Sequence, residues 1–169
     1  MGEPILNVIS SPVDLDTEYE EIKQLISDMI ETLDYGGEKT GLAAPQVFVS
    51  KRVVIFRISK NSKSLYKNQI TEDVPLTVMI NPVIKPLSDV VVDGYEACLS
   101  IPGLMGIVPR YRDIEYSYFN IEGEHFVIKA SGFHARVVQH ECDHLDGMLY
   151  HKKIKDLSNF GFVDLMQPS

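Results

Sequence analysis

The sequence predicts an α+β fold: mostly antiparallel β-sheets packed around a central helix that bears a His-Glu-x-x-His motif, with an amphipathic helix near the N-terminus. Three observations predict this class. An apolar stripe at helical spacing covers residues 14–35, alternating strands form a hairpin over 113–129, and a helical period returns at 132–145. Because helices and strands do not alternate regularly, a doubly wound sheet is not expected. With 169 residues, we expect one domain spanning 1–169.

Composition and charge exclude several classes of protein. The chain is 44% hydrophobic and 24% charged, which is ordinary for a globular domain. Its net charge of -8 argues against a protein whose main task is to bind nucleic acid or an anionic membrane. No apolar run approaches the roughly 20 residues of a membrane span. The first residues lack the basic start and apolar stretch of a secretory signal, so a cytoplasmic location with no membrane partner is expected.

The first helix, over residues 14–35, is predicted from one apolar stripe, formed by Ile22, Leu25, Ile26, Met29, Ile30 and Leu33. Thr17 and Glu20 have the spacing of a capping box at its start. Gly36 and Gly37 are expected to end it.

The strand predictions come from β-branched runs and period-two alternation. We expect strands over 52–58, 76–80, 90–92, 113–119 and 124–129. The polar stretch 59–73 is expected to be a loop, and Asn81-Pro82 to stop the second strand. The residues from Lys152 to Ser169 are weakly patterned and receive no element.

The strongest chemical signal is His140-Glu-Cys-Asp-His144 on the second predicted helix, 132–145, with Gly147 as its C-cap. Residues at i and i+4 lie on one helix face, so the two imidazoles can bind one metal ion. Glu141 can reach a water beside that metal without being a ligand. This arrangement is typical of metal-assisted hydrolysis.

Two histidines need a third ligand, and Cys98 is the candidate because a thiolate is a good soft donor. The alternatives are a buried apolar cysteine or a disulfide with Cys142. Position 142 lies about 200° around the helix from His140, which favours a core position for Cys142.

A third segment, Thr40-Gly-Leu-Ala-Ala-Pro-Gln46, combines small residues with one amide. Small residues allow a substrate or another backbone to approach closely. The Gln46 amide can donate to a developing oxyanion, and the alternative is a solvated glutamine in a tight turn.

Taken in order, three segments resemble the signature motifs of bacterial peptide deformylases. They are Thr40-Gly-Leu-Ala-Ala-Pro-Gln46, Glu96-Ala-Cys-Leu-Ser100 and His140-Glu-Cys-Asp-His-Leu-Asp-Gly147, and the resemblance covers roughly residues 20–150. It implies a metal-dependent hydrolase that removes the formyl group from the N-terminal formyl-methionine of newly made proteins and releases formate.

The resemblance also implies a role for each matching residue. Cys98, His140 and His144 match the metal ligands, Glu141 the general base and acid, Gln46 and the Leu99 N–H the oxyanion donors, Thr40, Gly41 and Ala97 the substrate-binding positions, and Glu96 and Arg110 a structural ion pair. The implied cofactor is one divalent metal ion per chain, ferrous iron (Fe2+) natively, with zinc (Zn2+), nickel (Ni2+) or cobalt (Co2+) able to take its place. The implied partners are formyl-Met N-termini of nascent chains and a transient ribosome contact, without sequence-specific nucleic acid binding.

The chain departs from the usual family pattern at Lys39, Phe48, Ala97 and Met105. Glycine is usual at the first three positions, and a basic residue near the bound peptide is common at the fourth. Lys39 has two interpretations: a surface residue at negative φ, or an ammonium above the groove that favours acidic peptides.

Two other functions are considered. A His-Glu-x-x-His metalloendopeptidase would need a long cleft and a third His or Glu ligand, and Cys98 argues against it. A catalytically impaired metal-binding or peptide-binding relative would be marked by Lys39 and Ala97. The sequence argues against an impaired relative, because it keeps the whole set of residues that the chemistry needs: Gln46, Cys98, His140, Glu141 and His144.

Overall fold

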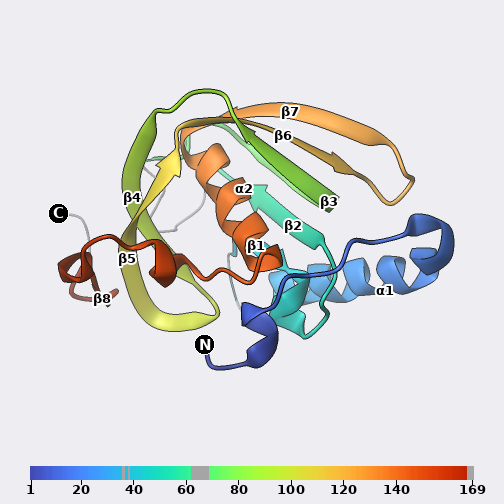
Figure 1. Ribbon diagram of the computed structural model, residues 1–169, viewed down its shortest axis with the longest axis horizontal. Coiled ribbons are helices and arrows are strands. Elements are labelled where there is room, and N and C mark those ends of the chain that lie inside the picture. Colours follow the sequence, from blue (N-terminus) through green and yellow to red (C-terminus); the bar gives the residue numbers. More distant parts are fainter. Residues whose placement is uncertain (36, 38, 62–68, 167–169) are drawn as a thin grey trace.

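The computed structural model describes residues 1–35, 37, 39–61 and 69–166 (Figure 1). Within this part of the chain, the helices α1 (Leu15–Asp34) and α2 (Gly132–Leu145) accompany two antiparallel sheets, ordered β1-β2-β3-β6-β7 and β4-β5-β8. The strands are β1 (Gly41–Ala43), β2 (Val53–Ile58), β3 (Val74–Pro86), β4 (Val91–Cys98), β5 (Ile101–Tyr111), β6 (Asp113–Phe119), β7 (His125–Ser131) and β8 (Phe160–Phe162). The predicted α+β class is confirmed. Among the described residues, no helix is long and apolar enough to cross a membrane.

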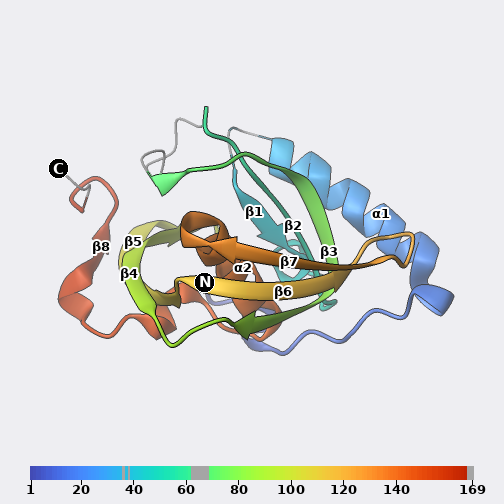
Figure 2. The same cartoon turned by 90° about the horizontal axis from the view of Figure 1, so that it is seen from above.

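The five-stranded sheet has a helix on each face, and β2 shows the physical reason. Val54 and Phe56 belong to the core cluster that includes the buried face of α2, whereas Val53 and Ile55 belong to the cluster that includes α1. Side chains alternate across a strand, so this apolar run serves both cores. Seen from above, α1 lies along the outer side of β1, β2 and β3 (Figure 2).

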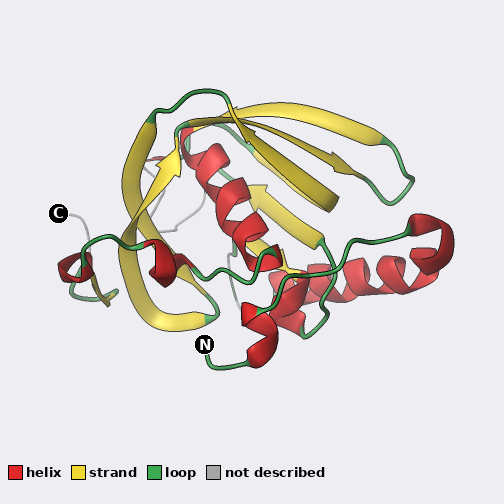
Figure 3. Ribbon diagram, viewed as in Figure 1, coloured by secondary structure: helices red, strands yellow, loops and turns green. Residues whose placement is uncertain are grey.

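Helix α2 occupies the centre of the molecule, with strands of both sheets around it (Figures 1 and 3). Its buried residues include the apolar Val138 and Leu145, but also the polar Arg136, Gln139, Glu141 and His144. A buried polar side chain is costly unless it is hydrogen-bonded or paired. The surroundings of these polar groups therefore define the site described below.

The start of α1 differs from the prediction. Its N-cap is Asp14, whose carboxylate accepts the N–H of Asp16, and the Glu18 carboxylate accepts the N–H of Asp14. Thr17 therefore lies inside the first turn instead of capping it. Asp14 can begin the helix because its short carboxylate satisfies a backbone N–H of the first turn. The helix ends at Asp34, and Gly36 lies outside the described residues.

The prediction that Asn81-Pro82 stops a strand is wrong, because β3 continues to Pro86 through a register shift between Ile80 and Val83. Asn81 adopts a φ of 52°, and its side-chain amide exchanges two hydrogen bonds of 2.8 Å with the backbone of Val13. Proline is tolerated at such a bulge because its missing N–H is not required there.

Strand β5 and the short strand β8 are absent from the predictions. Pro102, Gly103, Gly106 and Pro109 within β5 are typical of turns, and they conceal a strand that pairs along almost all of β4. Gly106 is required because a Cβ there would lie 2.5 Å from the Ile154 side chain. The expected strand at 90–92 is the start of the longer β4. Residues 62–68 of the expected loop lie outside the described residues.

Phe48 lies in the left-handed region, with φ 65° and ψ 25°, and its side chain is 67% exposed. This backbone conformation costs a non-glycine residue roughly 1–2 kcal/mol, and little burial offsets that cost. We expect Phe48→Gly to raise the free energy of unfolding by about 0.5–1 kcal/mol, after the greater flexibility of glycine in the unfolded chain is subtracted. Urea unfolding measures this change. The control is Val8→Gly, at an exposed residue with φ -110°, which should be destabilising. A Phe48→Gly variant less stable than the parent would contradict the strain argument.

Candidate metal centre and active site

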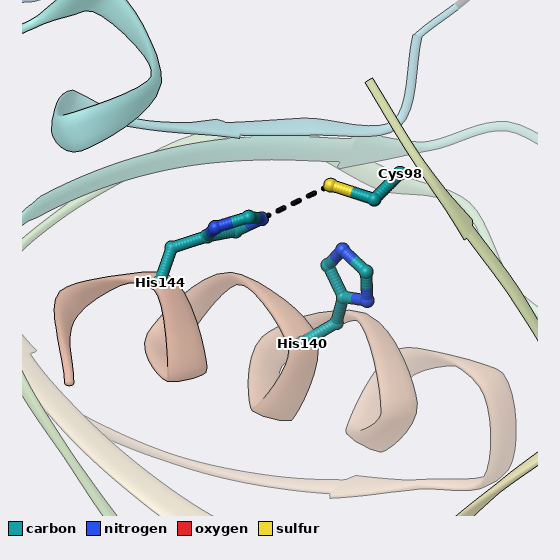
Figure 4. A group of neighbouring side chains, drawn as sticks. All are labelled: Cys98, His140 and His144. Atoms are coloured by element: carbon teal, nitrogen blue, oxygen red, sulfur yellow. Dashed lines mark hydrogen bonds between the residues drawn. The ribbon is translucent and has the colours of Figure 1, made fainter. Parts of the chain in front are cut away.

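Three metal-ligating side chains meet between α2 and the end of β4. The sulfur of Cys98 and one ring nitrogen each of His140 and His144 all lie within 4.8 Å of one another. Figure 4 shows both imidazoles rising from α2 toward Cys98, whose Sγ is 3.2 Å from His144 Nε2. One thiolate and two imidazoles are a donor set that suits a divalent transition metal and leaves a position open. These residues can therefore hold a metal ion. Cys142 is a free, buried cysteine in the core, as predicted.

Both histidines direct Nε2 toward the Cys98 sulfur. His140 Nδ1 lies 2.8 Å from the Glu96 carboxylate, which orients the ring and leaves its other nitrogen directed at Cys98. Burial, with a smaller contribution from the neighbouring His140, lowers the pKa of His144 to about 3. His144 is therefore neutral at physiological pH, as a metal ligand must be.

A buried charge network surrounds Glu96. Arg110 donates two hydrogen bonds of 2.8 Å to this carboxylate, and Arg136 donates a third at 2.8 Å. Burial alone would raise the pKa of Glu96, but the hydrogen bonds from Arg110 and His140 outweigh it and hold the pKa well below its usual range. Arg110 also pairs with Asp143, one residue before His144. The network therefore ties β4 and β5 to the helix that carries the histidines.

Sequence reasoning anticipated the Glu96–Arg110 pair but missed the part played by Arg136. Its guanidinium also donates to the backbone carbonyls of Val92 and Val108, at 2.7 and 2.8 Å, and so bridges β4 and β5. A signal was available. Arg136 precedes His140 by four residues, which puts it on the helix face that carries the metal-ligating histidines.

Glu141 is buried beside the cluster, and within the described part of the chain its Oε2 has no hydrogen-bond partner. Burial raises the pKa of Glu141 to about 7. Such a carboxyl can both accept and release a proton near neutral pH. Gly41 makes room for it, because a Cβ there would lie 2.4 Å from Glu141 Oε1.

The Gln46 amide faces the same point. Its Oε1 accepts the N–H of Ala43 at 2.9 Å, which fixes the amide so that Nε2 points toward Cys98 Sγ (3.7 Å) and Ser100 Oγ (3.1 Å). Leu99 lies in the turn after Cys98 with its side chain 53% exposed. A fixed amide N–H next to a metal cluster can stabilise negative charge that develops on an oxygen.

A cavity of about 410 Å³ opens onto this cluster. Its lining contains the predicted residues Thr40, Gly41, Gln46, Ala97, Cys98, Leu99, His140 and Glu141. Phe133 and Val137 on α2 add an apolar wall that sequence reasoning did not identify. Strand β1 pairs only on its β2 side, and β4 only on its β5 side, so both present a free edge in the described structure. The cavity therefore combines the polar groups beside Cys98 and His140 with an apolar wall formed by Phe133 and Val137.

Two of the sequence departures are explained by the structure. Met105 is fully buried, pairs with Ala97 and Gly161, and is absent from the cavity lining. Its side chain is therefore not among those that border the cavity, although the family pattern has a residue near the bound peptide at this position. The Lys39 ammonium donates to the backbone carbonyls of Thr32, at 3.0 Å, and Tyr35. It therefore caps the C-terminal end of α1, and the same residue also lines the cavity.

Lys39→Met is expected to lower the free energy of unfolding by about 0.5–1 kcal/mol, because a cation at a helix C-terminus stabilises the helix by this amount. The measurement is urea unfolding at low and high salt, and the loss should shrink as salt rises. Lys155→Met, at an exposed lysine, is the matched control. Unchanged stability, combined with a selective loss of activity on acidic peptides, would instead place the ammonium over the groove.

Comparison with known proteins decides the family. The sequence pattern of the family described as polypeptide deformylase matches residues 1–160. The chain belongs to the polypeptide deformylase family. Peptide deformylase 1 of Bordetella pertussis is 48% identical over 169 residues, covering 99% of this chain and 92% of the relative. Peptide deformylase 2 of Pseudomonas syringae pv. tomato is 46% identical with the same coverage.

Solved deformylases also share the fold. The structure of a class I type b peptide deformylase from Acinetobacter baumannii with Met-Ala-Ser bound has a TM-score of 0.82 and 36% identity, covering 91% of this chain and 94% of that one. As a deformylase, the chain is a metal-dependent hydrolase that removes the formyl group from the N-terminus of nascent proteins. The metallopeptidase and impaired-relative alternatives are not favoured by these similarities.

Proposed function

We propose that Cys98, His140 and His144 hold one divalent metal ion per chain, and that the deformylation reaction takes place at this site. The observation that supports the proposal is the convergence of one sulfur and two imidazole nitrogens within 4.8 Å, beside a buried carboxyl. Ferrous iron is the proposed native metal, and zinc, nickel or cobalt also suit this mixed thiolate and imidazole set. When bound, the metal supplies Lewis-acid chemistry that polarises the formyl carbonyl and acidifies a water molecule.

Glu141 is the proposed proton carrier. Its unpartnered Oε2 accepts the proton of the attacking water, and the same carboxyl then delivers that proton to the leaving amine nitrogen. Formate and a free N-terminus are released. A pKa near 7 matches both steps, because neither protonation state is strongly disfavoured.

Gln46 Nε2 and the backbone N–H of Leu99 are the proposed donors to the oxygen that becomes negative during the attack. The hydrogen bond from Ala43 to Gln46 Oε1 supports this role because it keeps the donor end of the amide facing the cavity. Each such donor contributes roughly 3 kcal/mol to transition-state stabilisation in other enzymes.

The proposed substrate is an extended peptide that begins with formyl-methionine. Gly41 on β1, Thr40 directly before it, and Ala97 on β4 are the proposed backbone partners, because both strand edges border the cavity. Phe133 and Val137 provide an apolar pocket for the methionine side chain. Met-Ala-Ser bound to the similar Acinetobacter baumannii enzyme supports a peptide of this kind. We further propose that residues 1–169 act as one catalytic domain in the cytoplasm, with transient contact to the ribosome.

The test is formate release from the tripeptide formyl-Met-Ala-Ser by anaerobically purified protein, with metal content measured on the same sample. We expect activity proportional to bound metal, up to one ion per chain. Chelation should abolish the activity, and added ferrous, nickel or cobalt ions should restore it. Metal-loaded protein that releases no formate would overturn the proposal.

A further inference from the structure

The C-terminal segment reaches the rim of the catalytic cavity. Strand β8 pairs with β5 so that Phe162 lies opposite Leu104. The next residue, Val163, donates its N–H to the Gly103 carbonyl at 3.0 Å, and its half-buried side chain lines the cavity that also contains Cys98 and Glu141. No motif marks this residue, which lies beyond the roughly 20–150 covered by the family resemblance.

The segment is packed in place, so Val163 occupies a defined position. The Tyr150 hydroxyl donates to the Leu104 carbonyl at 3.0 Å. Ile154 and Phe160 join the core cluster that contains Leu104 and Tyr150. Residues 101–104, at the rim of the cavity, therefore pack against the C-terminal segment. These contacts fix the position of Val163.

The lining contributed by residues 99–104 and by Val163 includes the apolar side chains of Leu99, Pro102 and Leu104. Lys39 and Tyr95 also line the cavity. Met105, at the position where the family pattern has a residue near the peptide, is fully buried and is not part of the cavity lining. A cavity of about 410 Å³ lies within the range of sites that hold drug-sized ligands, so it has room for more than a methionine side chain.

We propose that Val163 is a specificity-determining residue that contacts the substrate just after the formyl-methionine and favours apolar side chains there. The inference rests on the proposed function, because its occupant is the formyl-Met peptide. An apolar side chain placed against this rim removes apolar surface of both partners from water, whereas a serine side chain gains little from the same contact. The preference for apolar side chains after the methionine would thus come from the C-terminal segment, which lies outside the catalytic motifs.

The experiment compares kcat/KM for two peptides, formyl-Met-Leu-Leu and formyl-Met-Ser-Ser, in the metal-loaded enzyme. We expect the parent enzyme to prefer the leucine peptide. Val163→Ser should lower the leucine-to-serine ratio about fivefold, a typical loss for removal of a small apolar contact. The change should appear mainly in KM, because the contact is made equally in the ground state and the transition state.

Two further variants sharpen the test. Val163→Ile keeps an apolar side chain and should retain the preference, and Leu165→Ser changes a residue that is 82% exposed and outside the cavity lining, so the ratio should stay at the parent value. An unchanged ratio in Val163→Ser, or an equal loss of kcat for both peptides, would overturn the role of Val163. If the parent enzyme releases formate from neither peptide, the proposed function is overturned instead.

Discussion

Replacing Glu141 with glutamine should lower kcat for formyl-Met-Ala-Ser at least about 100-fold while the metal stays bound. The amide is close in shape to the carboxyl, but it cannot take a proton from water and pass it to the amine. Glu141 is not among the three clustered metal-ligating residues, so the metal content should be unchanged. The buried position of the side chain leaves bulk water unable to replace it easily as a proton carrier.

The measurement is kcat together with metal per chain on the same preparation. Glu122→Gln, at an exposed glutamate in the turn between β6 and β7, is the matched control and should retain parent activity. Thermal unfolding of both variants separates a chemical effect from a folding defect. Near-parent kcat in a fully metal-loaded Glu141→Gln variant would show that another group moves the proton.

Cys98→Ser should weaken metal binding at least about 100-fold, the upper end of the loss found when only a supporting residue is removed. In the parent, the Ser100 N–H and the Gln46 amide both point at the sulfur, at 3.4 and 3.7 Å. A serine hydroxyl is a weaker and harder ligand than a cysteine sulfur. We therefore also expect the metal preference to move toward harder ions.

Metal retained after dialysis against a graded series of chelators measures this affinity. Cys142→Ala is the control, because Cys142 is buried in the core on α2 and is not part of the cluster. It should cost stability but keep one metal ion per chain. Equal metal retention in Cys98→Ser and the parent would remove Cys98 from the proposed ligand set.

Local patterns determined much of this protein in advance. The bounds of α2 and β6 agree with the predicted 132–145 and 113–119. In β6 the predicted alternation is kept, with Ile114 and Tyr116 buried. The spacing of His140 and His144 alone put two imidazoles on one helix face. The sequence did not predict strand β5, because its prolines and glycines are typical of turns. Only pairing with β4 and β8 makes it a strand.

The tertiary structure decided what distant residues do for one another. Lys39 caps α1, Met105 is buried, and Arg136 on α2 pairs with Glu96 on β4. Val163 reached the cavity from the C-terminal segment. Each outcome depends on a contact between segments far apart in the chain, and neither composition nor periodicity carries information about such pairing. The sequence by itself therefore determined the chemistry on α2, whereas packing decided which side chains support that chemistry and which border its substrate.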